Sequence, residues 1–482
     1  MTFEALLTFA SVLIAAYAIA RPVQRRSVAL FVPSWLLPAA LLLAFGLLVV
    51  RDAPFGVKPL FHMSLEFAEF SLTASSFVLL VAAAGWCVWV WHSAILTPSK
   101  MKKVEELFQA ALLEGEFDEV ERVIRKNHDR LTGLPPTASS ILFQPKMVTS
   151  LTESGSLIHL ELLSDLSFLK TLESPFRAVD AVVRDLLVTD ISPLRTVVIA
   201  HYGGHDAPNL SDHDSSLLNR TFLNPDWYKA SRADYPLTIS AIEALGSGRF
   251  DAAYNARDDR YDATQGISTR ASCPIYLALK TQTLAIEAVL NKGITTGDFY
   301  VTGLMDVFRT VLRRSQTTSW NEDLHWEFPT PYAYLLHNVI YDLQHLSELA
   351  VRKATTNTTP PVVAKPGEVA RWIARTWTAC TWLIASPGDA VSDNFQENMI
   401  QVLLNFILQL HSQPSEIYPS WEDVPASELL AWRDLFVAEL REKFVADKVR
   451  QQVLKTAING LDYGKGWVFS GRSWLELELQ LL

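Results

Sequence analysis

Residues 201–214, HYGGHDAPNLSDHD, contain the densest group of metal-ligand side chains in the sequence. Imidazole and carboxylate groups together bind Zn²⁺ and other divalent ions, and Gly203 and Gly204 would let the backbone turn around such an ion. The candidate ligands are His201, His205, Asp212 and His213. The same composition is also typical of a solvated turn, and the spacing matches no established metal motif. We therefore expect a loop without a cofactor, with a divalent metal site as the alternative.

A second candidate pair overlaps this stretch. Arg195 precedes His201 by six positions in the sequence RTVVIAH. This interval is similar to the Arg-x4–6-His pattern of the HEPN family of helical ribonucleases, in which the pair lies at a shared dimer interface. The resemblance implies that Arg195 would position a phosphate and that His201 would move a proton. The residue after Arg195 is Thr196, where that family usually has Asn, Asp or His, and the resemblance covers only this interval.

The segment from 224 to 280 combines aromatic rings with cationic side chains, mostly on sequence typical of irregular backbone. Rings beside Arg and Lys can form a pocket for a nucleotide or another small anion. The residues proposed to line it are Trp227, Tyr228, Tyr261, Gln265, Arg270 and Lys280. The alternative is that the rings pack against helices while the charged groups pair in water.

Common catalytic motifs are missing from the sequence. There is no phosphate-binding G-x-x-x-x-G-K-[ST] loop, no G-x-S-x-G elbow, no H-E-x-x-H zinc motif and no C-x-x-C pair. The three cysteines, Cys87, Cys273 and Cys380, lie apart in apolar surroundings and are expected to be small buried hydrophobes. We therefore favour a protein that is not an enzyme.

The elements that must position these residues begin with three apolar segments, at about 3–20, 28–50 and 72–96. The third holds no Asp, Glu, Lys or Arg over 25 residues and ends with Trp86, Trp89 and Trp91. This length can cross a hydrocarbon layer of about 30 Å, and tryptophan favours the headgroup region. The sequence therefore predicts a three-helix transmembrane region over residues 1–99, with Pro33 and Pro38 kinking or delaying the second span.

Basic residues predict the orientation of these spans. Arg21, Arg25 and Arg26 lie on the same predicted side as the three lysines at 100, 102 and 103, whereas Arg51 and Lys58 lie on the other. The positive-inside rule then places the N-terminus outside and the large C-terminal region in the cytoplasm, at the inner (plasma) membrane. Residues 1–99 carry a net charge of +1 and the remainder −11. An acidic soluble region is a poor match for nucleic acid, which binds through neutralised phosphates.

After Lys100 the apolar residues follow a helical period almost throughout. Two amphipathic segments on either side of Gly115 predict a helical hairpin of solenoid type. The Pro-, Ser- and Thr-rich stretch 131–155 and the stretch 355–367 predict linkers. The fold class is thus mainly α, with helical domains at 100–354 and 368–482.

These features favour a membrane-anchored helical scaffold or sensor that binds a protein or a small anionic ligand at the inner membrane face. Its expected partners are the bilayer and either another protein or further copies of itself. One alternative is an oligomeric pore-forming or membrane-disrupting effector, of the kind used in bacterial defence against phage. The other is a membrane-tethered hydrolase, either metal-dependent or a ribonuclease using Arg195 and His201.

Overall fold

A computed structural model describes residues 3–52, 65–189, 192–202, 211–245, 270–292, 299–315, 331–356, 368–386, 391–412, 424–461 and 466–479. Every regular element in these ranges is a helix, which confirms the mainly α fold class. The chain divides into two compact units, Met1–Ala181 and Val182–Leu482. The predicted limit at residue 100 falls inside the first unit, and the predicted linker at 355–367 lies almost wholly outside the described residues.

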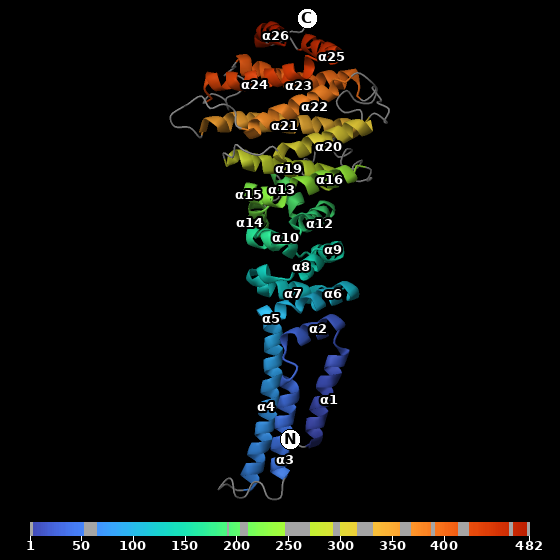
Figure 1. The fold of residues 1–482 in the computed structure, drawn as a ribbon, viewed down its shortest axis with the longest axis vertical. Coiled ribbons are helices and arrows are strands. Elements are labelled where there is room, and N and C mark those ends of the chain that lie inside the picture. The colour runs from blue at the N-terminus through green and yellow to red at the C-terminus, as the bar shows by residue number, and fades with distance from the viewer. Residues whose placement is uncertain are drawn as a thin grey trace. The chain divides into compact units, whose positions relative to one another are not determined.

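The first unit begins with four helices, which Figure 1 draws in blue. They are α1 (Phe3–Ile19), α2 (Pro22–Phe31), α3 (Leu36–Asp52) and α4 (Leu65–Ser93). Helices α3 and α4 lie side by side, α1 packs on α3, and α2 crosses the end of the group at which α4 ends. A small apolar cluster holds the long helices together: Leu6, Ala40, Ala44, Leu48 and Leu80.

Only one of the three predicted spans forms a single helix that is long and apolar enough to cross a membrane. This is Glu69–Ser93, 25 residues or about 37 Å. The second prediction was wrong at its start, because residues 28–31 belong to α2 and α3 begins at Leu36. Val32 has extended backbone before Pro33, as expected of a residue that precedes proline. Helices α1 and α3 have 17 residues each.

Short helices complete the first unit and continue into α12 (Pro175–Val188), which spans the division between the units. They are α5 (Pro98–Met101), α6 (Val104–Glu114), α7 (Asp118–Asn127), η1 (His128–Gly133), α8 (Pro136–Leu142), α9 (Pro145–Glu153), α10 (Ile158–Leu163) and α11 (Leu166–Thr171). The predicted α6–α7 hairpin is confirmed, and Gly115 ends α6 in the left-handed region at φ 73°. The linker predicted at 131–155 was wrong. Pro136 and Pro145 each begin a helix, a position that needs no backbone N–H.

The second unit is built of longer helices. They are α13 (Pro193–Tyr202), α14 (Asp212–Arg220), α15 (Pro225–Ser231), α16 (Asp234–Glu243), α19 (Pro274–Asn291), α20 (Phe299–Ser315), α21 (Pro331–Thr356), α22 (Glu368–Ile384), α23 (Asp393–Ser412), α24 (Ala426–Phe444), α25 (Lys448–Asn459) and α26 (Gly466–Glu478). Each packs mainly against helices that are near it in sequence.

Helix α19 lies at the centre of the packing around α13, α16, α20 and α21. Almost all of its side chains are buried, including the polar Lys280, Gln282 and Glu287. Gly303 on α20 allows close packing here, because a Cβ at that position would lie 2.5 Å from Thr238 Oγ1 and 2.6 Å from Gln282 Oε1. A helix buried on all sides that carries charge must satisfy that charge internally. The polar contacts of α19 are therefore a candidate functional site.

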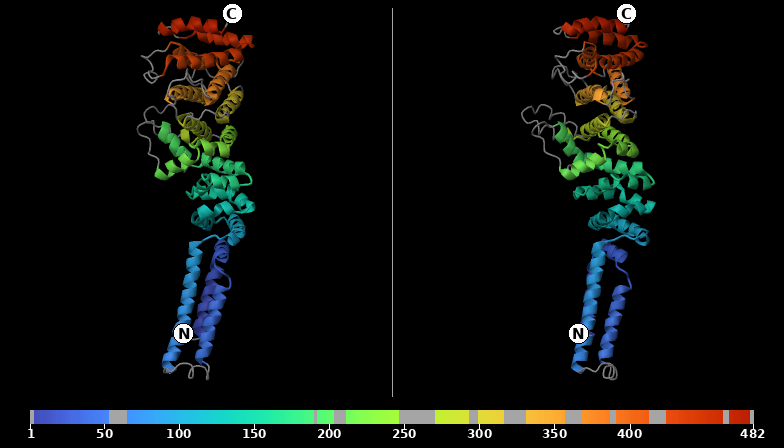
Figure 2. Two further views of the ribbon diagram at one scale, coloured as in Figure 1. Left: turned by 60° about the vertical axis from the view of Figure 1, so that its left-hand side comes forward. Right: turned by 90° about the vertical axis from the view of Figure 1, so that its left-hand side faces the viewer.

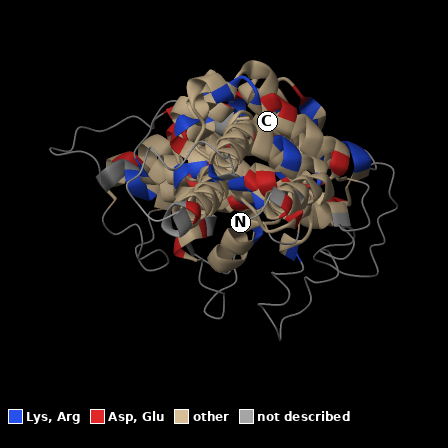
Figure 3. Cartoon of the chain, turned by 90° about the horizontal axis from the view of Figure 1, so that it is seen from below, with Lys and Arg blue, Asp and Glu red and all other residues tan. Residues whose placement is uncertain are grey.

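Charged residues of both signs are interspersed over the helices in the view of Figure 3. This pattern gives no support to nucleic-acid binding, which favours a basic stripe or patch.

Candidate functional site

The stretch expected to be a loop, with a metal site as the alternative, is divided between two helices where it is described. His201 lies in the last turn of α13, whereas Asp212 and His213 lie in the first turn of α14, which Ser211 caps through a 3.0 Å bond from Asp214 N–H. His205 lies outside the described residues. Among the residues that are described, no group of three or more His, Cys, Asp or Glu side chains is arranged to hold a metal ion. The metal hypothesis therefore gains no support from the geometry.

Arg195 and His201 both lie on α13. Six residues correspond to about 600° of helical rotation, so the two side chains leave the helix about 120° apart. The imidazole of His201 instead contacts Glu287, at 3.5 Å between Nε2 and Oε2. Within one chain, α13 does not aim this pair at a common phosphate.

The residues proposed for an anion pocket are engaged within the protein where they are described. Trp227 and Tyr228 are buried core residues of α15. The Arg270 guanidinium donates to Tyr334 Oη at 3.1 Å, and Lys280 pairs with Asp342. The other two proposed residues, Tyr261 and Gln265, lie outside the described residues. The four described side chains therefore contribute to packing and internal charge pairing.

These internal contacts define a histidine–carboxylate cluster, which comprises His201, Lys280, Glu287, Asp342 and His345 and ties α19 to α13 and α21. The Lys280 ammonium and the Asp342 carboxylate form an ion pair in which each side chain is 7% exposed. Thr283 Oγ1 donates to the second oxygen of Asp342 at 3.2 Å. A buried ion pair that is well hydrogen-bonded offsets part of the cost of removing both charges from water.

The aromatic ring of Tyr202 covers the Lys280 ammonium, with 4.9 Å between the nitrogen and the ring centroid. The Tyr276 ring lies 5.4 Å from the same nitrogen, so both rings add cation–π attraction. Burial raises the pKa of both phenols, with a further contribution from the charge of Asp342. The two phenols therefore stay neutral at physiological pH.

Glu287 forms the other end of this cluster. Its carboxylate, 10% exposed, lies between two half-exposed imidazoles: His345 Nε2 is 3.2 Å from Oε1, and His201 Nε2 is 3.5 Å from Oε2. The hydrogen bond to Glu287 is the main reason that the pKa of His345 is raised. By contrast, burial and the nearby charge of Lys280 lower the pKa of His337 to about 4. One carboxylate therefore joins three helices, through His201 on α13 and His345 on α21.

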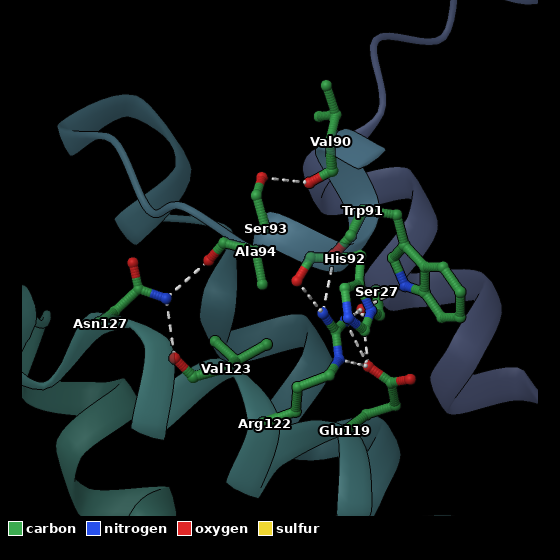
Figure 4. Close-up of polar contacts among 10 residues, drawn as sticks. All are labelled: Ser27, Val90, Trp91, His92, Ser93, Ala94, Glu119, Arg122, Val123 and Asn127. Atoms are coloured by element: carbon green, nitrogen blue, oxygen red, sulfur yellow. Dashed lines mark hydrogen bonds and ion pairs between the residues drawn. The ribbon is translucent and has the colours of Figure 1, made fainter. Parts of the chain in front are cut away.

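A second polar site lies in the first unit, at the C-terminal end of α4 (Figure 4). We call it the junction; it comprises Ser27, Trp91, Glu119, Arg122 and Asn127. The Arg122 guanidinium donates to the backbone oxygens of Trp91 at 2.7 Å and His92 at 3.3 Å, and to Ser27 Oγ at 3.0 Å. It also pairs with Glu119 at 2.6 Å, where the two side chains are 20% and 14% exposed.

Arg122 thus satisfies carbonyl oxygens that have no partner within α4, as every helix leaves its last carbonyls unpaired. Its positive charge also lies at the negative end of the helix dipole. The guanidinium lies over the Trp91 ring at 5.1 Å, and Trp91 Nε1 donates to Ser27 Oγ at 3.1 Å. The end of α4, helix α2 and helix α7 are thereby fixed to one another.

Asn127 holds the chain immediately after α4. Its amide nitrogen donates to Ala94 O at 2.6 Å, and its oxygen accepts from Leu96 N–H at 2.7 Å. Ala94 is buried and has φ 48°, a left-handed conformation that costs free energy for any residue with a Cβ. These two bonds help to hold the strained turn between the apolar helix and the helices that follow.

The junction was not predicted from the sequence, although the sequence contains one signal of it. Val120, Val123, Ile124 and Asn127 share one face of α7 by helical spacing, and all four are buried. A polar Asn at a position that the period assigns to the core indicates a buried hydrogen-bonding role. The sequence gives no comparable signal for the partners of Arg122.

No family model, curated protein or solved structure matches this chain. Its class therefore follows from its own fold: a mainly α protein that carries, within its described residues, one helix with the length and apolarity of a membrane span.

Proposed function

We propose that this protein is a membrane-anchored helical scaffold or sensor that binds a protein or a small anionic ligand at the cytoplasmic face of the inner membrane. The observation that carries the proposal is the continuity between α4 and the helices after it. Only 11% of the most apolar window of α4 is buried within the structure, yet its C-terminal end is held by Arg122 and Asn127. A helix that packs on α3 along one side, is mostly exposed elsewhere and is fixed at one end suits a rigid membrane anchor.

In this proposal α1 and α3 enter the bilayer together with α4. Each would extend about 26 Å, somewhat less than the hydrocarbon thickness. Many large apolar side chains of these helices are exposed, as lipid-facing residues are: Leu7, Val12, Ile14, Leu42, Leu43, Val78, Val81 and Val88. Short spans are tolerated when neighbouring helices pack against them and flanking residues anchor them.

The end of the helical group that carries the junction is proposed to lie at the cytoplasmic interface. Exposed aromatic rings occur here at Tyr17, Trp35, Trp86 and Trp89. The basic residues of α2 and of the segment after α4 lie at the same end. Aromatic rings and excess Lys and Arg together are typical of a cytoplasmic membrane boundary.

The anchoring is tested on the full chain expressed in bacterial cells. We expect the protein to stay in the membrane pellet after alkaline carbonate extraction. Single cysteines introduced after Lys103 should react only with membrane-permeant maleimide in intact cells, because that region would be cytoplasmic. A freely soluble protein, or labelling of these cysteines by an impermeant reagent, would refute the proposal.

The binding role is tested by crosslinking in native membranes, followed by purification in detergent and mass spectrometry. We expect a protein or a small anionic molecule to co-purify in a fixed ratio with the intact chain. The matched control is the segment 1–96 alone, which should not retain it. A chain that purifies without any stoichiometric companion would argue against a scaffold or sensor.

A further inference from the structure

Helix α2 has one face that packs mainly on α6 and an opposite face that does not. Helix α2 buries Val23, Ser27, Leu30 and Phe31, and it packs mainly on α6. At 100° per residue, Arg25 lies about 200° around the helix from Val23, and Ala29 about 240°. Arg25 and Ala29 therefore lie on the side opposite the packed face. The chain turns by 120° between α1 and α2, and the Arg25 side chain reaches back to the end of α1.

Arg25 is held in place by one end of its guanidinium. Its Nε donates to Ala20 O, just after the end of α1, at 2.8 Å. Its two terminal nitrogens have no hydrogen-bond or carboxylate partner among the described residues. The neighbouring arginines differ, since Arg21, which precedes α2, pairs with Glu116 at 3.0 Å and Arg26 with Glu106 at 3.1 Å. Arg25 thus presents a fork of donors that matches a phosphate.

The charge around Arg25 favours an anion. Lys102 and Lys103 follow the end of α4, are exposed, and have no carboxylate partner in the part of the chain that the structure describes. Lys100 donates to Phe31 O at 3.1 Å, which places this lysine-rich segment beside the C-terminal end of α2. Two glutamates in the neighbourhood, Glu106 and Glu116, are already paired with arginine.

We propose that Arg25 binds the phosphate of an anionic phospholipid headgroup in the inner leaflet. This inference rests on the membrane anchoring proposed above, and it names a lipid partner for the anchor. The Ala20 carbonyl orients the guanidinium, and the phosphate occupies the two terminal nitrogens. Lys102 and Lys103 add long-range attraction, so that phosphatidylglycerol is preferred over phosphatidylcholine.

The test uses native mass spectrometry of the full chain in detergent, titrated with phosphatidylglycerol or with phosphatidylcholine. We expect tighter binding of phosphatidylglycerol, and at least about a fivefold weaker affinity in Arg25→Gln, because the phosphate loses its hydrogen bonds from a charged donor. Glutamine keeps a donor for the Ala20 carbonyl, which favours folding. Arg25→Lys keeps the charge without the fork and should bind with intermediate affinity.

The matched control is Arg177→Gln, which removes an exposed arginine from α12 and should leave lipid affinity unchanged. Equal affinity for the two lipids, or an Arg25→Gln variant that binds like the wild type, would overturn the inference. Displacement of the lipid by excess inorganic phosphate would also overturn it, because the ligand would then be free phosphate. Carbonate extraction of the same variants separates the two proposals: release of the wild type from membranes refutes the anchor itself.

Discussion

The junction and the histidine–carboxylate cluster both use a carboxylate to tie helices together, yet they respond differently to their surroundings. At the junction, Glu119 pairs with Arg122, whose guanidinium stays charged at every physiological pH. In the cluster, Glu287 pairs with His201 and with His345, and the hydrogen bond to Glu287 raises the pKa of His345. The Glu119–Arg122 ion pair at the end of α4 therefore does not change with pH, whereas the Glu287–His345 contact in the second unit does.

The two sites also differ in what they hold. Arg122 and Asn127 bond mainly to backbone atoms at the end of α4, so they fix the path of the chain. The cluster joins side chains only, across α13, α19 and α21. Side-chain pairs can exchange partners without unwinding a helix, whereas loss of a backbone cap leaves carbonyls unpaired. We therefore expect the junction to hold the end of α4 rigidly, and the cluster to allow α13, α19 and α21 to change their side-chain pairing.

The largest expected effect comes from the buried pair in the cluster. Lys280→Met leaves the Asp342 charge buried without its partner, and we expect α19 and α21 to lose about 3–5 kcal/mol of stability. The double variant with Asp342→Leu should recover most of this loss. Hydrogen exchange of α19 and α21 peptides in the detergent-solubilised full chain measures both. Equal losses in the single and double variants would show that the ion pair is not the cause.

Replacing Arg122 should have a smaller but local effect. Arg122→Ala removes the bonds to Trp91 O and His92 O and leaves Glu119 with only the Ser27 hydroxyl, so we expect a loss of about 3 kcal/mol around the end of α4. Hydrogen exchange and limited proteolysis of residues 90–97 measure the change. Lys126→Ala, an exposed residue on the same helix, is the control and should leave the junction protected. Protection of residues 90–97 in Arg122→Ala would remove the rigid role from the junction.

The smallest expected effect is the one that depends on pH. The pKa of His345 is raised in the folded protein, so its contribution is complete below the ordinary value of about 6.5 and is lost as pH rises through the raised value. His345→Gln should therefore destabilise the second unit at pH 6, by less than about 1 kcal/mol for a half-exposed pair, and leave it unchanged at pH 9. Thermal unfolding of both proteins across this range measures the difference. A difference that is the same at both pH values would contradict the pH-dependent role.

His337 provides the opposite sign within the same helix. Its pKa is lowered to about 4, so its neutral form stabilises the fold above pH 6.5, and that contribution falls as the pH drops toward 4. The comparison of His345→Gln with wild type at each pH cancels this background, because both proteins contain His337. The stability that Arg122 gives to the end of α4 should stay the same between pH 6 and pH 9.

The sequence correctly predicted the elements that depend on the types and spacing of neighbouring residues. The α6–α7 hairpin followed from its apolar period and from Gly115, and α4 followed from its uninterrupted apolar run. The composition of residues 131–155 led to a wrong prediction of a linker, because proline begins helices as readily as it marks loops. Composition also misled at Trp227 and Tyr228, whose rings pack into the core. Ring and charge content alone does not say whether a partner is a ligand or another helix.

By itself the sequence determined that this chain is built of helices, that one of them contains a long apolar run, and that the remainder is acidic. These properties depend on the period and composition of neighbouring residues. Only the tertiary structure decided the partners of Arg122, Glu287 and Lys280 on other helices, because these contacts join positions 30 to 95 residues apart. Which distant side chain meets a buried charge is settled by helix packing, and no local pattern in the sequence encodes it.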